Sequence, residues 1–273
     1  MKNISIITDG SCDIPKEIVE KYGVKLIPLH FQFEDQVEYG SERKMEIGEF
    51  YKRLANGEVA KTSASSPSAA LQILKEELEK GNDIICVTLS SALSCTFNNI
   101  RLASLELLDS YPENRITIID SLTGSMAMGM LVIKACMMRD EKYSYDQIVE
   151  YLEENKQSFH VEFYVNDLQY LARGGRLNPA IAKIGGLIGI KPILSVSPVT
   201  STIRLFSSSQ TSLFIAPKHT RLVPVSFLCS SHFSLLLIQT QSSFQIWKNP
   251  PSYLTALSAL NTKRLPRVPP SGI

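Results

Sequence analysis

The stretch IICVTLSSALSCT, residues 84–96, decides the fold. It opens with a continuous apolar run, Ile84–Leu89, which is typical of a strand buried on both faces of a parallel sheet. A serine-rich loop follows at once and leads into residues 92–108, whose pattern predicts a helix. A strand that runs directly into a helix is the unit from which parallel sheets with helices on both faces are built.

The same unit recurs on both sides of this stretch. Further strands are expected at residues 4–8, 24–30 and 116–119, and further helices at 15–22, 44–54, 67–79, 125–138 and 144–155. Asp13 is a candidate N-cap for the first of these helices, and Pro67 is well placed at the start of the third, residues 67–79. The alternation predicts an α/β fold with a parallel-sheet N-terminal domain, residues 1–158.

A second, smaller α/β domain is expected to begin after residue 158. Residues 161–165 read as a strand, and residues 167–172 read as a short helix that ends at Gly174-Gly175. We assign residues 159–196 to the start of this C-terminal domain. Whether the domain is complete stays open, because the amino-acid composition changes after Val196.

Residues 197–273 form an atypical tail rich in Ser and Pro. Residues 1–196 carry 21 Lys+Arg and 27 Asp+Glu, a net charge of −6, whereas the tail carries 7 and 0, a net charge of +7. Its cations are spread rather than clustered, which argues against a membrane or nucleic-acid arm. The composition favours a frameshifted or otherwise aberrant C-terminus over a divergent, poorly ordered tail.

Bulk properties narrow the class of protein. The net charge of +1 argues against a nucleic-acid partner, which would leave a basic patch. No apolar stretch approaches the roughly 18 residues of a spanning helix, so stable membrane insertion is not expected. Five scattered cysteines without paired spacing fit free thiols in a reducing compartment, and the apolar run Ile4–Ile7 is too short for the core of a signal sequence, so none is expected. We expect a cytoplasmic protein.

Two hydroxyl-rich loops are the leading candidates for a binding site. Thr62 and Ser63 precede one expected helix, and Ser90, Ser91 and Ser94 precede another. Hydroxyls together with the free N–H groups of a helix N-terminus can hold an anion. Simple N-capping is the structural alternative, although one serine would suffice for it. The two loops would converge at one edge of the sheet.

Two further segments follow strands at the same edge. Asp9 ends the first strand, where a tight turn is an equally good explanation, and Ser125 begins a helix after the strand at 116–119. The small residues around Ser125 favour close packing of that helix on the sheet. Arg173 and Arg176 flank a Gly pair and could bind phosphate, but we favour a role in joining the two domains.

Several catalytic signals are missing from the sequence. It contains no phosphate-binding loop, no dinucleotide fingerprint, no zinc-protease motif and no nucleophile elbow. His30 and His160 are isolated on expected strands. We therefore expect no catalytic residue, no metal and no cofactor.

The loops, taken in order, resemble the DegV family. The resemblance lies in the segments Ile6–Asp9, Thr62-Ser63, Ser90–Ser94, Asp120-Ser121 with Ser125, Tyr170–Arg176 and Gly189–Leu194. It covers residues 1–196 and stops there. Cys95 stands where the family usually has Gly, and Ala64-Ser65 replaces the usual Gln-Pro. No Asp/Gly turn or late His region of the family type follows Ser195.

The resemblance implies two α/β domains with one long-chain fatty acid between them. It implies that Thr62 and Ser90 or Ser91 hold the carboxylate, with Ser63, Ser94, Asp9 and Ser125 nearby as ligand-binding candidates. It also implies a carrier, not an enzyme, that presents the fatty acid to a separate ATP-dependent fatty acid kinase in phospholipid metabolism. Two alternatives stay open: a phosphotransferase-type enzyme that uses the serine loops, and a non-functional aberrant product.

Overall fold

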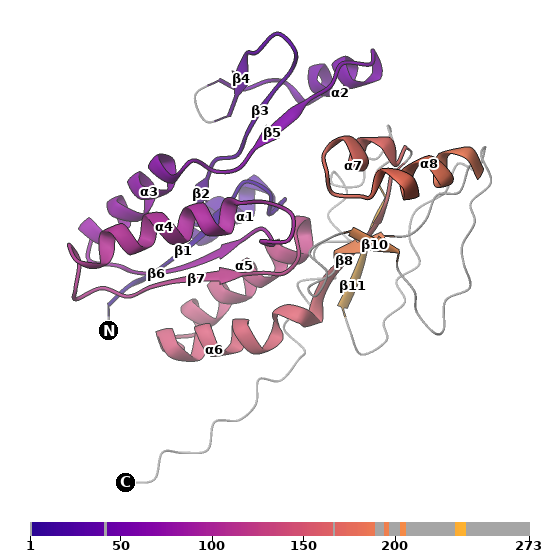
Figure 1. The fold of residues 1–273 in the computed structure, drawn as a ribbon. Coiled ribbons are helices and arrows are strands. Elements are labelled where there is room, and N and C mark those ends of the chain that lie inside the picture. The colour runs from indigo at the N-terminus through magenta and orange to yellow at the C-terminus, as the bar shows by residue number, and fades with distance from the viewer. Residues whose placement is uncertain are drawn as a thin grey trace.

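The main sheet is four-stranded and parallel, with the order β2-β1-β6-β7 (Figure 1). The structure is a computed structural model and describes residues 2–40, 43–165, 167–188, 194–196, 203–205 and 233–238. The strands are β1 (Ile4–Asp9), β2 (Lys25–Ile27), β6 (Asp83–Thr88) and β7 (Ile116–Asp120). The predicted α/β fold with a parallel sheet is confirmed.

Helices cover both faces of this sheet. They are α1 (Lys16–Tyr22), α3 (Pro67–Glu79), α4 (Thr96–Leu108), α5 (Ser125–Asp140) and α6 (Tyr145–Asn155). Ile6, Ile85 and Val87 pack with residues of α1, α5 and α6, whereas Ile7 and Cys86 pack with residues of α3 and α4. Successive side chains of a strand point to opposite faces, so each strand supplies both cores.

The starts of α3 and α6 follow local sequence signals, and that of α1 does not. Ser66 caps α3, its Oγ accepting a hydrogen bond from the Ala69 N–H at 3.1 Å, and Pro67 occupies the first turn. Ser144 and Gln147 form a capping box at the start of α6. The expected Asp13 cap of α1 is wrong. Asp13 has a left-handed φ of 51°, and its carboxylate accepts a hydrogen bond from Ser125 instead.

The strand expected at residues 24–30 is divided in two by Pro28, which has no N–H to continue the ladder. Its second part joins a small antiparallel sheet, β4-β3-β5, made of β3 (His30–Gln32), β4 (Glu38–Tyr39) and β5 (Lys61–Ser63). With α2 (Ile47–Ala55), this sheet forms an arm that projects from the main sheet (Figure 1). Phe31, Phe33 and Phe50 pack edge-on or tilted within it.

A second sheet begins at Phe159, beside the boundary expected near residue 158. A single 3-10 turn, η1 (Lys156–Ser158), leads into it. Its order is β10-β9-β8-β11, and β8 pairs in parallel with β11 and antiparallel with β9. The strands are β8 (Phe159–Tyr164), β9 (Leu194–Val196), β10 (Ile203–Leu205) and β11 (Phe233–Ile238). Two segments of the atypical tail are thus strands, and the rest of the tail lies outside the described residues.

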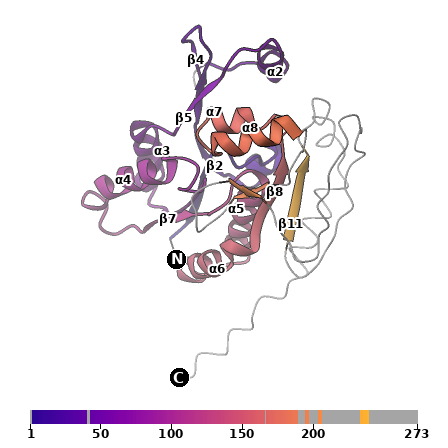
Figure 2. The ribbon, with the colours of Figure 1, turned by 45° about the vertical axis from the view of Figure 1, so that its right-hand side comes forward.

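Helices α7 (Gln169–Arg173) and α8 (Pro179–Ile188) lie next to each other beside the second sheet in both views (Figure 2). Leu93, from the loop after β6, packs into their core with Leu168, Leu177 and Leu194. Ala127 of α5 contributes to a second patch with residues of β8 and β9. No helix within the described part of the chain is long and apolar enough to cross a membrane.

Candidate functional site

The loops at the carboxyl ends of β1, β6 and β7 meet, as expected for neighbouring parallel strands. Asp9, at the end of β1, is fully buried and connects two of them. Its Oδ1 accepts hydrogen bonds from the Ser11 N–H at 2.9 Å and the Ser11 hydroxyl at 2.5 Å, and its Oδ2 accepts one from the Leu89 N–H at 2.7 Å. Oδ1 therefore holds the β1 loop itself, and Oδ2 holds that loop to the loop after β6.

Ser90 and Ser91 are adjacent but have opposite environments. Ser90 is fully buried, and its Oγ accepts a hydrogen bond from the Ala92 N–H at 3.2 Å. Ser91 is exposed, and its hydroxyl donates to Asp120 Oδ2 at 2.5 Å while its N–H donates to Asp120 Oδ1 at 3.1 Å. A hydroxyl has one hydrogen, so Ser91 offers only lone pairs while this bond lasts.

Ser94 closes the loop onto α4. Its Oγ lies 2.9 Å from Thr96 Oγ1 and accepts a hydrogen bond from the Thr96 N–H at 3.2 Å. Thr96 is fully buried at the first position of α4. The pair therefore fixes the end of the loop by the local side-chain-to-backbone bonding typical of Ser and Thr.

Thr62 and Ser63 were expected in a loop, but they are the last two residues of strand β5, where they pair with Phe31 and His30 of β3. Both are exposed, and neither side chain has a hydrogen-bond partner among the described residues. The loop proper is residues 64–66, and residues 62–66 together are called the Thr62-Ser63 loop. The chain then turns inward at Ser65, whose N–H donates to Thr96 Oγ1 at 3.4 Å and whose carbonyl accepts from Asn99 Nδ2 at 2.9 Å. These two contacts bring the Thr62-Ser63 loop to the first turns of α4, next to the serine loop.

Ser125 lies apart from these contacts. Its hydroxyl donates to Asp13 Oδ2 at 2.5 Å, and its φ of 54° is left-handed. Burial raises the pKa of Asp13, and the hydrogen bond from Ser125 opposes that shift. The pair connects the β1 loop to the start of α5.

Arg176 attaches the α7–α8 segment to the serine loop. Its Nε and Nη2 donate to the Leu93 carbonyl at 3.0 and 2.9 Å, and Nη1 donates to the Gly174 carbonyl. An open pocket of about 310 Å³ lies here, lined by residues 91–95 and 174–176. Arg173 instead stacks on Tyr170, 4.5 Å from the ring centroid. The contact of Arg176 agrees with the expected role in joining the two parts of the chain.

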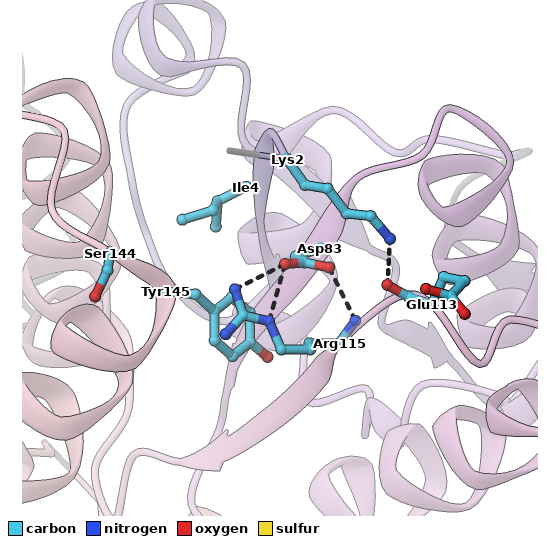
Figure 3. A pocket seen from close by; sticks show the side chains of 7 residues that line it. All are labelled: Lys2, Ile4, Asp83, Glu113, Arg115, Ser144 and Tyr145. Atoms are coloured by element: carbon cyan, nitrogen blue, oxygen red, sulfur yellow. Dashed lines mark hydrogen bonds and ion pairs between the residues drawn. The ribbon is translucent and has the colours of Figure 1, made fainter.

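A second hollow, of about 270 Å³, lies at the opposite end of the main sheet (Figure 3). Buried Asp83 accepts from the Arg115 N–H and Nε at 2.9 and 3.0 Å, and the guanidinium lies 4.1 Å from the Tyr145 ring centroid. Lys2 is bonded to the Glu113 carbonyl. Because the buried Asp83 carboxylate is already paired with Arg115, we interpret this hollow as a structural ion-pair site.

The chemistry available at the hydroxyl loops is that of neutral donors. Within the described residues, no group of three or more His, Cys, Asp or Glu side chains could hold a metal ion. Burial raises the pKa of the Cys12 thiol to about 11 and places that of Cys86 well above its ordinary value. The loops can therefore orient an anionic head group, with hydroxyls and helix N-termini as donors.

Three residues outside the predicted set of ligand-binding residues complete this arrangement. Asp120 accepts from Ser91, and Thr96 and Asn99 hold Ser65. Asp120 lies in a segment that the sequence did indicate, and it ends β7 as Asp9 ends β1. Asn99 carries no such signal, because its partner lies 34 residues away in the sequence.

Known proteins are similar to this chain in sequence and fold. A family model described as "Uncharacterised protein, DegV family" matches residues 3–211 and so extends beyond Val196. Protein DegV of Bacillus subtilis is 35% identical over 196 residues, which cover 70% of this chain and 67% of that protein. A DegV domain-containing protein of Clostridium perfringens is 34% identical over 199 residues, 72% and 68% of the two chains.

Solved structures are also similar to this chain in fold. A crystal structure of DegV from B. subtilis, described as a fatty acid binding protein, matches with a TM-score of 0.64 and 32% identity over 77% of this chain and 73% of that one. A stearic acid-binding protein from Eubacterium ventriosum matches with a TM-score of 0.68 and 26% identity over 76% and 70%. The family match over residues 3–211, the similar relatives and the similar solved structures lead to one conclusion: this chain belongs to the DegV family.

Proposed function

We propose that this protein binds one long-chain fatty acid and holds its carboxylate at the two hydroxyl loops. The observation that carries the proposal is their convergence: Ser65 connects the Thr62-Ser63 loop to Thr96, which also contacts Ser94. Relatives described as fatty-acid-binding proteins support the ligand class.

Within this proposal the hydroxyls have different roles. Thr62 and Ser63 are exposed with hydrogens free to donate, and Ser90 uses its Oγ as an acceptor and retains its hydrogen. Ser91 can donate to a ligand only by giving up its bond to Asp120. We therefore assign the first carboxylate contact to Thr62, with Ser63 beside it and the Ser90-Ser91 pair opposite.

Asp9 and Ser125 act indirectly in this scheme. Asp9 shapes the loops through Ser11 and Leu89, and Ser125 does so through Asp13. Ser94 acts through its contact with Thr96. The neutral donors leave the carboxylate charged and nucleophilic, whereas a paired arginine would hold it in a bidentate ion pair.

The hydrocarbon tail would supply most of the affinity. A chain with about 14 methylenes gains roughly 11 kcal/mol on full burial, at about 0.8 kcal/mol for each. Association costs take back several kcal/mol, so a tight complex remains. The hydroxyls then contribute orientation more than affinity.

We further propose that the bound acid is presented to a separate ATP-dependent fatty acid kinase, so that this chain is a carrier rather than an enzyme. Such a role, in phospholipid metabolism, calls for an oriented carboxylate and needs no nucleotide site on the carrier. The four described cysteines are free, which supports a cytoplasmic setting. We retain residues 1–158 as the head-group domain and 159–196 as the start of the lipid-binding domain, with 197–273 as a tail.

Titration of the full chain with a C16 or C18 fatty acid tests the proposal. We expect saturable binding of one acid per chain, weakened about tenfold in Thr62→Val, because one hydrogen bond to a charged group is worth roughly 1.5–3 kcal/mol. Thr117→Val, at the structural Tyr145 contact, is the matched control. Absence of saturable binding by well-folded protein would contradict the proposal.

A further inference from the structure

The first two turns of α4 contact both hydroxyl loops. Thr96 Oγ1 lies 2.9 Å from Ser94 Oγ on one side and accepts from the Ser65 N–H at 3.4 Å on the other. Thr96 and Ser65 are both fully buried. A buried polar contact of this kind holds one geometry, because any displacement leaves polar groups without partners.

Asn99 extends this contact one turn further along α4. Its Nδ2 donates to the Ser65 carbonyl at 2.9 Å, so the backbone of Ser65 is held at both its N–H and its C=O. Ser65 lies two residues after Ser63 and three after Thr62. Fixing Ser65 against α4 therefore limits where the end of β5 can place its hydroxyls.

Helix α4 is itself fixed in the protein core. Its residues Ile100, Ala103 and Leu107 are buried in the core shared with α3 and β6. The neighbouring Asn98 is exposed on the same turn. The two asparagines therefore differ in environment, although they are adjacent in the sequence.

We propose that Asn99, together with Thr96, is a positioning residue that sets the spacing between the Thr62-Ser63 loop and the Ser90–Ser94 loop. It contacts no ligand in this scheme. Its effect is to match the distance between the two sets of donors to the two oxygens of one carboxylate. The inference rests on the proposed function and adds the element that determines head-group specificity.

The test compares a fatty acid with the fatty alcohol of the same chain length. The two share a tail and differ in the head group, so loss of loop spacing lowers affinity for the acid alone. In Asn99→Leu we expect the Kd for the acid to rise about tenfold, the equivalent of roughly 1.4 kcal/mol, while that for the alcohol changes less than about twofold. Asn98→Leu, one residue away, should leave both unchanged.

A second pair of variants covers the case in which Asn99→Leu folds poorly. Thr96→Ser keeps the hydroxyl and should retain the acid preference, whereas Thr96→Val removes it and should lose that preference. Equal weakening of acid and alcohol, or no change in the acid, would overturn the positioning role. Wild-type protein that binds acid no better than alcohol would instead refute the proposed carboxylate site, so the two failures are distinguishable.

Discussion

Replacement of Asp9 by Asn separates a role in holding the loops from a role in contacting ligand. The Asp9 carboxylate is fully buried and accepts three hydrogen bonds, two from Ser11 and one from the Leu89 N–H. Asn has nearly the same volume but only one acceptor oxygen. One side of the amide must then direct its NH₂ group at a donor, Ser11 or the Leu89 N–H.

The expected cost follows from those contacts. A hydrogen bond to a charged group is worth roughly 1.5–3 kcal/mol, and a buried donor left without a partner costs about 1–3 kcal/mol. Asn also avoids the free-energy cost of burying a charged carboxylate, which offsets part of this loss of stability. We expect Asp9→Asn to lower the free energy of unfolding by about 2–4 kcal/mol, a large share of the 5–15 kcal/mol typical of a folded domain.

Urea unfolding followed by circular dichroism measures this change directly. Asp109→Asn is the matched control, since Asp109 is exposed at the end of α4 and should change stability by no more than about 0.5 kcal/mol. A loss below about 1 kcal/mol for Asp9→Asn, combined with a large loss of fatty-acid affinity, would refute the loop-holding role. Asp9 would then be a ligand contact.

Other parts of the structure give further expectations. Arg176→Met removes two hydrogen bonds to the Leu93 carbonyl, so the amide hydrogens of residues 168–182 should exchange faster while those of β6 exchange as in wild type. Unchanged exchange in both segments would argue against a role of Arg176 in attaching the α7–α8 segment to the serine loop. Burial raises the pKa of Tyr145 to about 12, above the value of about 10 in an unfolded chain, so its neutral form stabilises the fold below pH 10 and that contribution is lost as pH rises toward 12. Tyr145→Phe should therefore lose less stability than wild type between pH 10 and 12, and equal slopes would contradict this. In a Cys229→Ser background, Cys95 should account for the fast reaction with a disulfide reagent, because its thiol is exposed. Burial raises the pKa of the Cys12 thiol to about 11 and that of the Cys136 thiol to about 12, so both should react slowly. A fast phase that persists in Cys95→Ser would be contrary to this expectation.

Much of the main sheet could be predicted from local patterns. The apolar run at Ile84–Leu89 predicted a buried strand because a strand covered on both faces needs no polar alternation, and β6 is buried along its whole length. The start of α3 was predicted from Pro67, whose effect is confined to one turn, and Ser66 caps that turn. The pattern around Pro28 predicts one continuous strand because apolar residues flank it on both sides, whereas the missing N–H of proline divides it into β2 and β3.

The candidate site was harder, since its contacts are distant in sequence. Composition and position selected the hydroxyl loops but did not indicate that Ser91 donates to Asp120, 29 residues away, or that Asp9 binds Leu89, 80 residues away. Asp13 shows the same limit: its type and position suggested a cap, and its partner Ser125 lies 112 residues away. Local chemistry predicts which groups are present, and the fold decides which of them are already engaged.

The most direct test of the carboxylate site is mass spectrometry of lipid extracted from purified full-length protein, compared with its Thr62→Val variant. The account predicts close to one fatty acid per wild-type chain after expression in bacteria. After dialysis of both equally folded proteins against lipid vesicles that compete for the acid, it predicts less in the variant, as expected for about tenfold weaker binding. Well-folded wild-type protein that yields no fatty acid, or a variant that retains as much as wild type, would contradict it.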